Sequence, residues 1–264
     1  MNLNALLFDE NEKPLDRLSN DGGFVGIFRT VACIGDSLAS GEFEVMSTLD
    51  GSKMYLDRYD YSWGQYMARE AGLTVYNFSR GGMTAKHYIT SFANENGFWK
   101  PELAANAYVI ALGVNDLLNR GWEIGTVKDI CLEDYRKNAE TFAGQFAYII
   151  QRYKEIQPDA RFFLVTMPKA QHGNDERNSK ADAHAALLHE IAKLFDNTYV
   201  IDLREYGPEY DADFRRKFYL NGHLNPAGYL LTAKMITSYI DYIIRHNLED
   251  FKHVGLMGHE YQRN

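Results

Sequence analysis

The sequence is poor in the features that mark several common classes of protein. Its 264 residues include only two cysteines, Cys33 and Cys131, which lie far apart. Two distant cysteines fit a reducing compartment without a disulfide framework. No apolar run approaches the length of a membrane span. The chain has no run of basic residues and a net charge of −8, which argues against binding to nucleic acid or to anionic membranes.

The N-terminus also lacks the basic region of a signal peptide. The apolar part of residues 1–8 is short and runs directly into Asp9 and Glu10, so we expect a cytoplasmic protein. Apolar residues make up 45% of the chain, an ordinary share for a globular protein. The length fits one large α/β domain. We expect a lead-in over residues 1–28, the domain over 29–250 and a tail over 251–264.

Short apolar runs alternate with helical patterns along the chain. The longest helical pattern covers residues 135–156, where apolar residues recur at steps of four and three. Asn225 and Pro226 are an N-cap and a first helical residue for the last helix, and Asp60 is the expected cap of a helix over 61–71. Predicted strands cover 31–34, 73–78, 107–112, 161–166 and 198–202, whereas 41–60 and 204–224 are expected to be loops. The alternation predicts a single doubly wound domain with a parallel sheet covered on both faces.

Residues suited to chemistry follow the predicted strands. Ser37 follows the first strand, Gly82 the second and Asn115 the third, and His223 lies on the loop before the last helix. Each has an ordinary explanation as a turn residue, a helix start or a surface side chain. However, ligands of such a sheet bind outside the carboxyl ends of its strands. Four such residues at one edge therefore predict a site.

The residue types point to acyl transfer. A serine hydroxyl becomes a nucleophile when a base lies within hydrogen-bond reach, and His223 is the candidate. Attack on an acyl carbonyl creates an oxyanion that needs donors already in place. The backbone N–H groups of Ser37 and Gly82 and the side-chain amide of Asn115 are three candidate donors.

The same segments resemble the blocks of the GDSL family within the SGNH hydrolase superfamily. The four matching segments are, in chain order, 35–38 (GDSL), 77–84, 113–116 (GVND) and 222–226 (GHLNP). The resemblance implies a flavodoxin-like three-layer α/β/α sandwich with a five-stranded parallel sheet. It also implies hydrolysis of esters or thioesters by Ser37 and His223, without a metal or an organic cofactor.

One position departs from the family pattern. The family places an aspartate three residues before the histidine, and this chain has Leu220 there. A substitute must orient the imidazole, and our first hypothesis is a backbone carbonyl of the loop before His223. A carboxylate from elsewhere is the second hypothesis, with Asp211 or Asp213 ahead of Asp202.

The sequence identifies the substrate less closely than it identifies the type of reaction. Asp36 and Trp122 are candidates for substrate binding, and small acyl esters of sugars are favoured over lipids because no long apolar lid is evident. His184 and His189 are interpreted as surface or core residues rather than metal ligands. Two other hypotheses stay open: a degenerate hydrolase that binds acylated glycans, and a flavodoxin-like phosphate or cofactor binder using residues 35–41. The oligomeric state is open.

Overall fold

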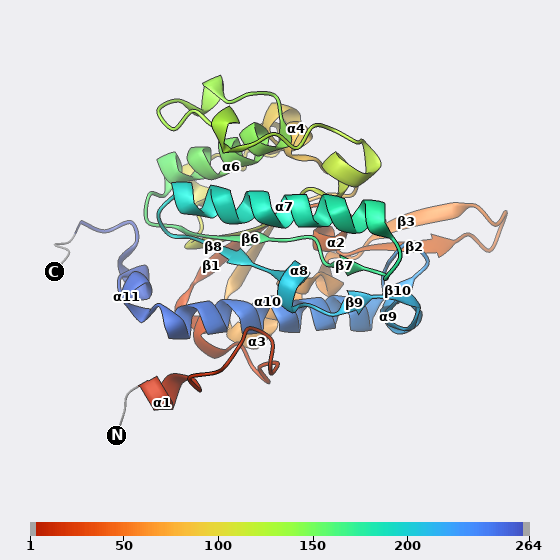
Figure 1. Ribbon diagram of the computed structural model, residues 1–264, viewed down its shortest axis with the longest axis horizontal. Helices are drawn as coiled ribbons and strands as arrows, with labels where there is room; N and C mark the ends of the chain where they lie inside the picture. Colours follow the sequence, from red (N-terminus) through yellow and green to blue (C-terminus); the bar gives the residue numbers. More distant parts are fainter. Residues whose placement is uncertain (1–3, 261–264) are drawn as a thin grey trace.

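A parallel sheet of five strands runs through the middle of the computed structural model, which describes residues 4–260. The strand order is β4-β1-β5-β6-β8 (Figure 1). The strands are β4 (Thr74–Ser79), β1 (Thr30–Gly35), β5 (Ala107–Ala111), β6 (Arg161–Val165) and β8 (Thr198–Ile201). This order confirms the predicted flavodoxin-like sheet, with β1 in contact with both β4 and β5. The ends of the strands that carry the first three motifs are therefore neighbours.

Helices cover both faces of the sheet, as the long apolar strands require. In Figure 1, α6 (Phe142–Ile156) and α7 (Asp175–Leu194) lie above it, and α3 (Trp63–Ala71) and α10 (Pro226–His246) lie below. Successive side chains of β6 enter the two cores alternately. Phe162 packs in the core on the α6 and α7 side, and Phe163 packs in the core on the α10 side.

Short elements complete the structure. The helices are α1 (Asn4–Leu7), α2 (Ser37–Ser40), α4 (Ala85–His87), α5 (Ala93–Glu95), α8 (Leu203–Tyr206), α9 (Ala212–Phe218) and α11 (Leu248–Phe251). The additional strands are β2 (Glu42–Met46), β3 (Lys53–Asp57), β7 (Lys169–Ala170), β9 (Glu209–Tyr210), β10 (Tyr219–Leu220) and β11 (His223–Leu224). In the expected tail, Phe251 and Val254 pack in the core on the α10 side.

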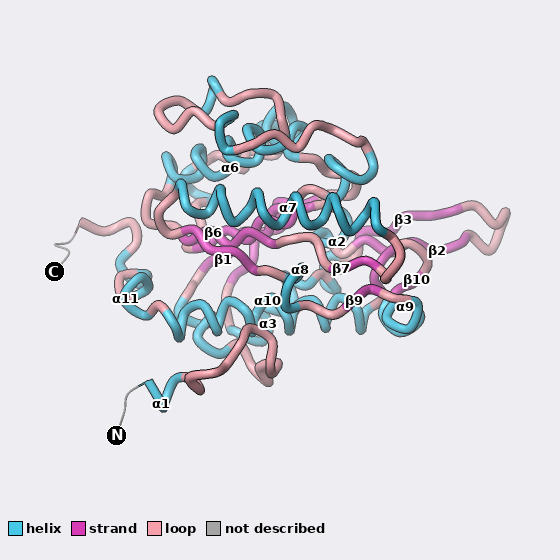
Figure 2. The backbone as a smooth tube through the Cα atoms, viewed as in Figure 1, coloured by secondary structure: helices cyan, strands magenta, loops and turns pink. Residues whose placement is uncertain are grey.

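Two segments expected to be loops contain structure. Strands β2 and β3 form an antiparallel hairpin that projects from the body of the molecule (Figure 2). The segment before α10 contains α8, α9 and three short strands. The two-residue strands β10 and β11 pair with each other and carry Leu220 and His223 in register.

Two helices begin later than predicted. The side chain of Ser62, rather than Asp60, caps α3 by accepting a hydrogen bond from Gln65 N. The apolar periodicity that starts at residue 135 does not belong to one helix, because Tyr135–Lys137 is a separate 3-10 turn. Thr141 then caps α6. The predicted cap and first residue of α10, Asn225 and Pro226, are confirmed.

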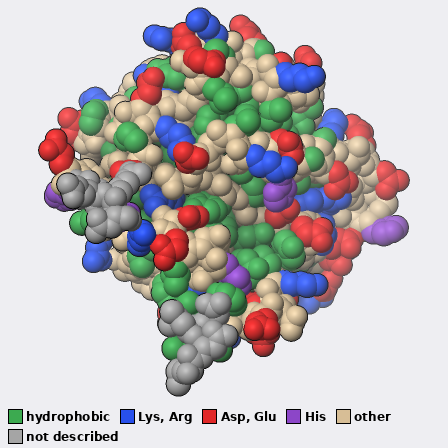
Figure 3. Space-filling view, turned by 60° about the vertical axis from the view of Figure 1, so that its left-hand side comes forward, with side chains coloured by type: hydrophobic (Ala, Val, Ile, Leu, Met, Phe, Trp, Pro, Cys, Tyr) green, Lys and Arg blue, Asp and Glu red, His purple; other side chains and the backbone are tan. Residues whose placement is uncertain are grey.

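The surface shows mixed charge. On the face in Figure 3, acidic and basic side chains are interspersed with apolar ones. Among the described residues, none of the helices combines the length and the apolar character that crossing a membrane requires.

A buried tyrosine ties α10 to the end of the first strand. Tyr229 of α10 is 0% exposed. Its hydroxyl donates to the Glu42 carbonyl at 2.6 Å and lies 3.3 Å from the Ser37 carbonyl. The same side chain therefore fixes both the turn after β1 and the start of the hairpin.

We predict that Tyr229→Phe lowers the free energy of unfolding by about 1–3 kcal/mol, because the part-buried Glu42 carbonyl loses its short hydrogen bond from the tyrosine. Urea denaturation measures the change. Tyr242→Phe on the same helix is the control, because within residues 4–260 the Tyr242 hydroxyl makes no hydrogen bond. Equal stability of the two variants would show that the Tyr229 hydroxyl contributes nothing to the fold.

Candidate active site

The first strand ends in a turn that presents Ser37. Asp36 caps the short helix α2, and its Oδ1 accepts a hydrogen bond from Leu38 N at 3.0 Å. Ser37 is the first residue of that helix, so its N–H has no partner within the helix. The Ser37 N–H makes no hydrogen bond to any other described residue either. The helix ends at Gly41, whose φ of 83° is left-handed.

The turn after β4 presents a second free donor. Gly82 has a φ of 69°, which glycine adopts without strain, and a Cβ added there would meet nothing within 4 Å. Within the described part of the chain, the Gly82 N–H has no hydrogen-bond acceptor. The space beside the Gly82 Cα is therefore open.

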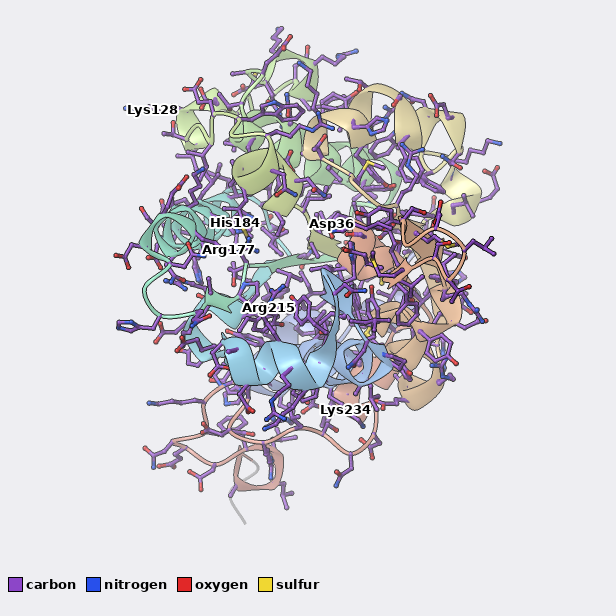
Figure 4. All side chains as sticks on the ribbon, turned by 90° about the vertical axis from the view of Figure 1, so that its right-hand side faces the viewer. Asp36, Lys128, Arg177, His184, Arg215 and Lys234 are labelled. Carbon is purple, nitrogen blue, oxygen red and sulfur yellow. The ribbon has the colours of Figure 1, made fainter. Side chains whose placement is uncertain are left out.

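Asn115 joins the ends of three neighbouring strands. Its Nδ2 donates to the Met83 carbonyl at 3.0 Å and to Asp36 Oδ2 at 3.3 Å. Its Oδ1 accepts from Asn119 Nδ2 at 2.7 Å, which fixes the orientation of the amide. The sequence prediction that Ser37, Gly82 and Asn115 follow adjacent strand ends is therefore confirmed. Figure 4, drawn from the hairpin side, labels Asp36 at the level of the sheet, above Lys234 of α10.

Two buried carboxyl groups support these strand ends. Asp116 is 0% exposed. Its Oδ1 accepts from Ala85 N at 2.9 Å, and its Oδ2 has no hydrogen-bond partner among the described residues. Burial raises the pKa of Asp116 to about 6 and that of Asp36 to about 6, with each Asp36 oxygen already engaged. We therefore interpret Asp36, expected as a substrate ligand, as a residue that positions Ser37 and Asn115.

His223 lies between two carboxylates of the hairpin. Its Nδ1 is 3.3 Å from Glu44 Oε2, and its Nε2 is 3.2 Å from Glu42 Oε1. The ring of Tyr55 meets the imidazole edge to face at 5.8 Å between centroids. Within residues 4–260, the imidazole makes no hydrogen bond to the Ser37 hydroxyl, although β11 and α2 contact each other.

The carbonyl hypothesis for orienting His223 is wrong, because carboxylate oxygens occupy both ring nitrogens. The three aspartates proposed in its place have other partners. Asp202 Oδ2 pairs with His189 Nε2 at 2.7 Å, and Asp211 caps α9 by accepting from Phe214 N at 2.8 Å. Asp213 pairs with Arg216 and Lys217.

Sequence reasoning missed Glu42 and Glu44. They lie in a segment interpreted as a polar loop, and they alternate with Phe43 and Val45, which is the pattern of a half-buried strand. That alternation was the available signal. The contact itself joins residues far apart in the chain and is not visible in any local motif.

Trp122 lines a hollow of about 180 Å³ together with Lys180 and Ala183 of α7. Its backbone N–H donates to the Asp116 carbonyl at 2.9 Å. A different, largely apolar cavity of about 80 Å³ lies beside the turn that carries Ser37 and is lined in part by Asp36, Leu38 and Val114.

The two other histidines singled out in the sequence have structural partners. His184 is buried, its Nδ1 accepts from Met167 N at 3.3 Å, and its Nε2 lies 3.1 Å from the Leu112 carbonyl. Burial lowers the pKa of His184 to about 4. Within residues 4–260, no group of three or more His, Cys, Asp or Glu side chains could hold a metal ion.

Comparison with known proteins identifies a family. The model of the GDSL-like lipase/acylhydrolase family matches residues 33–231, which is most of the chain and includes all four motifs. A search of curated proteins finds no match to the sequence.

Solved structures share the fold. A family two carbohydrate esterase from Clostridium thermocellum, in complex with cellohexaose, is 17% identical, with a TM-score of 0.56, over 90% of this chain and 66% of that one. A carbohydrate esterase family 2 enzyme plus carbohydrate binding domain from Corynascus thermopiles (Myceliophthora fergusii) is 15% identical, with a TM-score of 0.57, over 88% and 69%. A carbohydrate acetylesterase from Sinorhizobium meliloti is 16% identical, with a TM-score of 0.53, over 81% and 99%.

The raised pKa of Asp116 predicts a loss of stability as pH rises. Between about pH 4 and pH 6 the folded protein keeps a proton that the unfolded chain releases, so the free energy of unfolding falls across this window. For a carboxyl raised from 3.8 to about 6, the full effect is about 3 kcal/mol. Asp116→Asn should remove this contribution, so we expect the variant to gain stability relative to the wild type between pH 4 and pH 7. Urea denaturation of both proteins at pH 4 and pH 7 measures the difference. If the free energy of unfolding changed equally with pH in the two proteins, the claim that Asp116 is charged and buried at pH 7 would be contradicted.

Proposed function

Because the chain belongs to the GDSL-like lipase/acylhydrolase family, we propose that it is a serine esterase with Ser37 as nucleophile and His223 as base. One observation supports this most strongly. The N–H groups of Ser37 and Gly82, both without acceptors among the described residues, occur at the same sheet edge as the Asn115 amide. Donors left free at one sheet edge, where ligands of such a sheet bind, suit an oxyanion.

The proposed reaction begins with a proton transfer. The Ser37 hydroxyl gives its proton to His223 Nε2 as its oxygen attacks the acyl carbonyl. In the structure Nε2 contacts Glu42, so this nitrogen must exchange Glu42 for the serine when substrate enters. Such exchanges are expected, because catalytic hydrogen bonds are often completed only in the substrate complex.

The negative charge that develops on the carbonyl oxygen then needs donors. The N–H groups of Ser37 and Gly82 supply two. For the third, the oxyanion competes with Asp36 for the N–H of Asn115 that makes the longer contact, 3.3 Å. The protonated His223 next gives its proton to the leaving alcohol, and a water molecule activated by the same imidazole hydrolyses the acyl-enzyme.

We further propose that the substrates are short acyl esters, with acetylated carbohydrate as the first candidate class. One structural neighbour is named a carbohydrate acetylesterase, which supports a short acyl group. The names of the structural neighbours, which are carbohydrate esterases, support the sugar part of the proposal.

Ser37→Ala should abolish hydrolysis of 4-nitrophenyl acetate and should also abolish covalent labelling by a fluorophosphonate, because both require the serine oxygen. Mass spectrometry of the labelled wild type should place the adduct on the peptide that contains Ser37. Ser40→Ala is a matched control in the same turn and should still be labelled. A folded Ser37→Ala protein that keeps its labelling would refute the assignment of the nucleophile.

Asn115→Ala should lower kcat by about 10²–10³, the cost of removing one oxyanion donor. KM should change much less, because the donor acts mainly on the charge that develops in the transition state. Steady-state kinetics separate the two constants, and circular dichroism checks the fold. A folded variant with near-normal kcat would give Asn115 a structural role only.

A further inference from the structure

We propose that Glu44 is the carboxylate that positions His223, in place of the aspartate that the family carries three residues before the histidine. The inference rests on the proposed function, since His223 needs orientation only if it acts as a base. The role falls to a residue of the hairpin. In the sequence this residue is close to Ser37 and far from His223.

Glu44 has the surroundings of a fixed and charged group. Its side chain is 6% exposed, and its two oxygens have different partners. Oε2 lies 3.3 Å from His223 Nδ1, and Oε1 lies 2.8 Å from Lys53 Nζ on the paired strand β3. The hydrogen bond from Lys53 lowers the pKa of Glu44, which keeps the carboxylate ionised at neutral pH.

The loop before the histidine is shaped to receive this side chain. A Cβ on Gly222 would lie 2.3 Å from Glu44 Oε2, so a larger residue would displace the carboxylate. Asn221 has a φ of 55°, and its Nδ2 donates to the Glu44 carbonyl at 2.9 Å. Leu220, at the position of the family aspartate, is 40% exposed and offers no charge. Backbone and side chains therefore favour Glu44 next to Nδ1.

Glu42 contacts the same ring but does not position it for catalysis. It lies at Nε2, the nitrogen that must accept the Ser37 proton, so it competes with the serine instead of supporting it. Its Oε2 would lie 2.1 Å from a Cβ at Gly81, so it rests against the turn that carries Gly82. Burial raises the pKa of Glu42. The two glutamates on one strand therefore provide an internal comparison between the two ring nitrogens.

The chemistry assigns Glu44 a defined part in the reaction. When the Ser37 proton moves to Nε2, the imidazole becomes a cation with N–H groups at both nitrogens. The Nδ1–H then donates to Glu44 Oε2, and the negative charge stabilises the imidazolium. Glu44 itself gains no proton. In the serine-protease example, replacing the equivalent carboxylate by an amide costs about 10⁴ in kcat.

Three full-length variants test the proposal by kinetics: Glu44→Gln, Glu44→Asp and Glu42→Gln. We expect Glu44→Gln to lower kcat on 4-nitrophenyl acetate by about 10²–10⁴, with KM nearly unchanged. The kcat of Glu44→Asp should be at least tenfold higher than that of Glu44→Gln, because aspartate restores the charge. Glu42→Gln should lower kcat much less than Glu44→Gln, because it removes a charge beside Nε2 and leaves the contact at Nδ1 intact. A folded Glu44→Gln enzyme with kcat within threefold of the wild type would overturn the proposal, and so would an equal loss in Glu42→Gln.

Proton NMR of the same proteins gives a readout that does not depend on turnover. At a pH where the imidazole is protonated, the Nδ1–H resonance of His223 should appear at low field in the wild type and in Glu42→Gln. It should be lost or shifted upfield in Glu44→Gln. If the wild type neither hydrolyses esters nor labels at Ser37, the proposed function fails. The NMR comparison would still decide whether Glu44 holds His223, and an unchanged resonance in Glu44→Gln would show that it does not.

Discussion

The contact between Glu44 and His223 Nδ1 is the interaction on which the proposed site depends. An imidazole serves as a base toward a neighbouring hydroxyl when its other nitrogen is held and its cationic form is stabilised. The 3.3 Å contact meets both needs with one carboxylate, and Lys53 balances the charge of that carboxylate. The family motif lacks its acid in this chain, where Leu220 stands in its place, and in our proposal the hairpin supplies the acid instead.

The path of the chain after β1 explains how the hairpin can supply it. Ser37 begins α2, Gly41 turns the backbone, and β2 starts at the next residue. The proposed nucleophile and the proposed carboxylate therefore lie on one short segment, and Tyr229 fixes that segment to α10 through the Ser37 and Glu42 carbonyls. Since α10 begins directly after β11, the same helix also anchors His223. One tyrosine and one helix thus hold both the Ser37 turn and His223, the two parts of the proposed catalytic machinery.

The sequence predicts the framework better than the details of the site. The strands of the central sheet follow from short apolar runs between helical patterns, and the start of α10 follows from Asn225 and Pro226. Ser37, Gly82 and Asn115 could be placed together because parallel strands end at one edge. The hairpin was missed because the sequence of β3 does not alternate between polar and apolar residues. In the structure all five residues of this strand are exposed, so no such alternation is required. Glu44 could not be found from spacing, because its partner lies 179 residues away and the contact arises only from the folded chain.

The most direct test is a crystal structure of the protein after reaction with a fluorophosphonate. We predict that phosphorus is bonded to Ser37 Oγ and that a phosphoryl oxygen lies within hydrogen-bond distance of Ser37 N, Gly82 N and Asn115 Nδ2. His223 Nδ1 should remain on Glu44, and Nε2 should have left Glu42 and turned toward the adduct. An adduct on Ser37 with His223 Nδ1 facing solvent or a backbone carbonyl would contradict the role given to Glu44. A phosphoryl oxygen that meets none of the three donors would contradict the site as a whole.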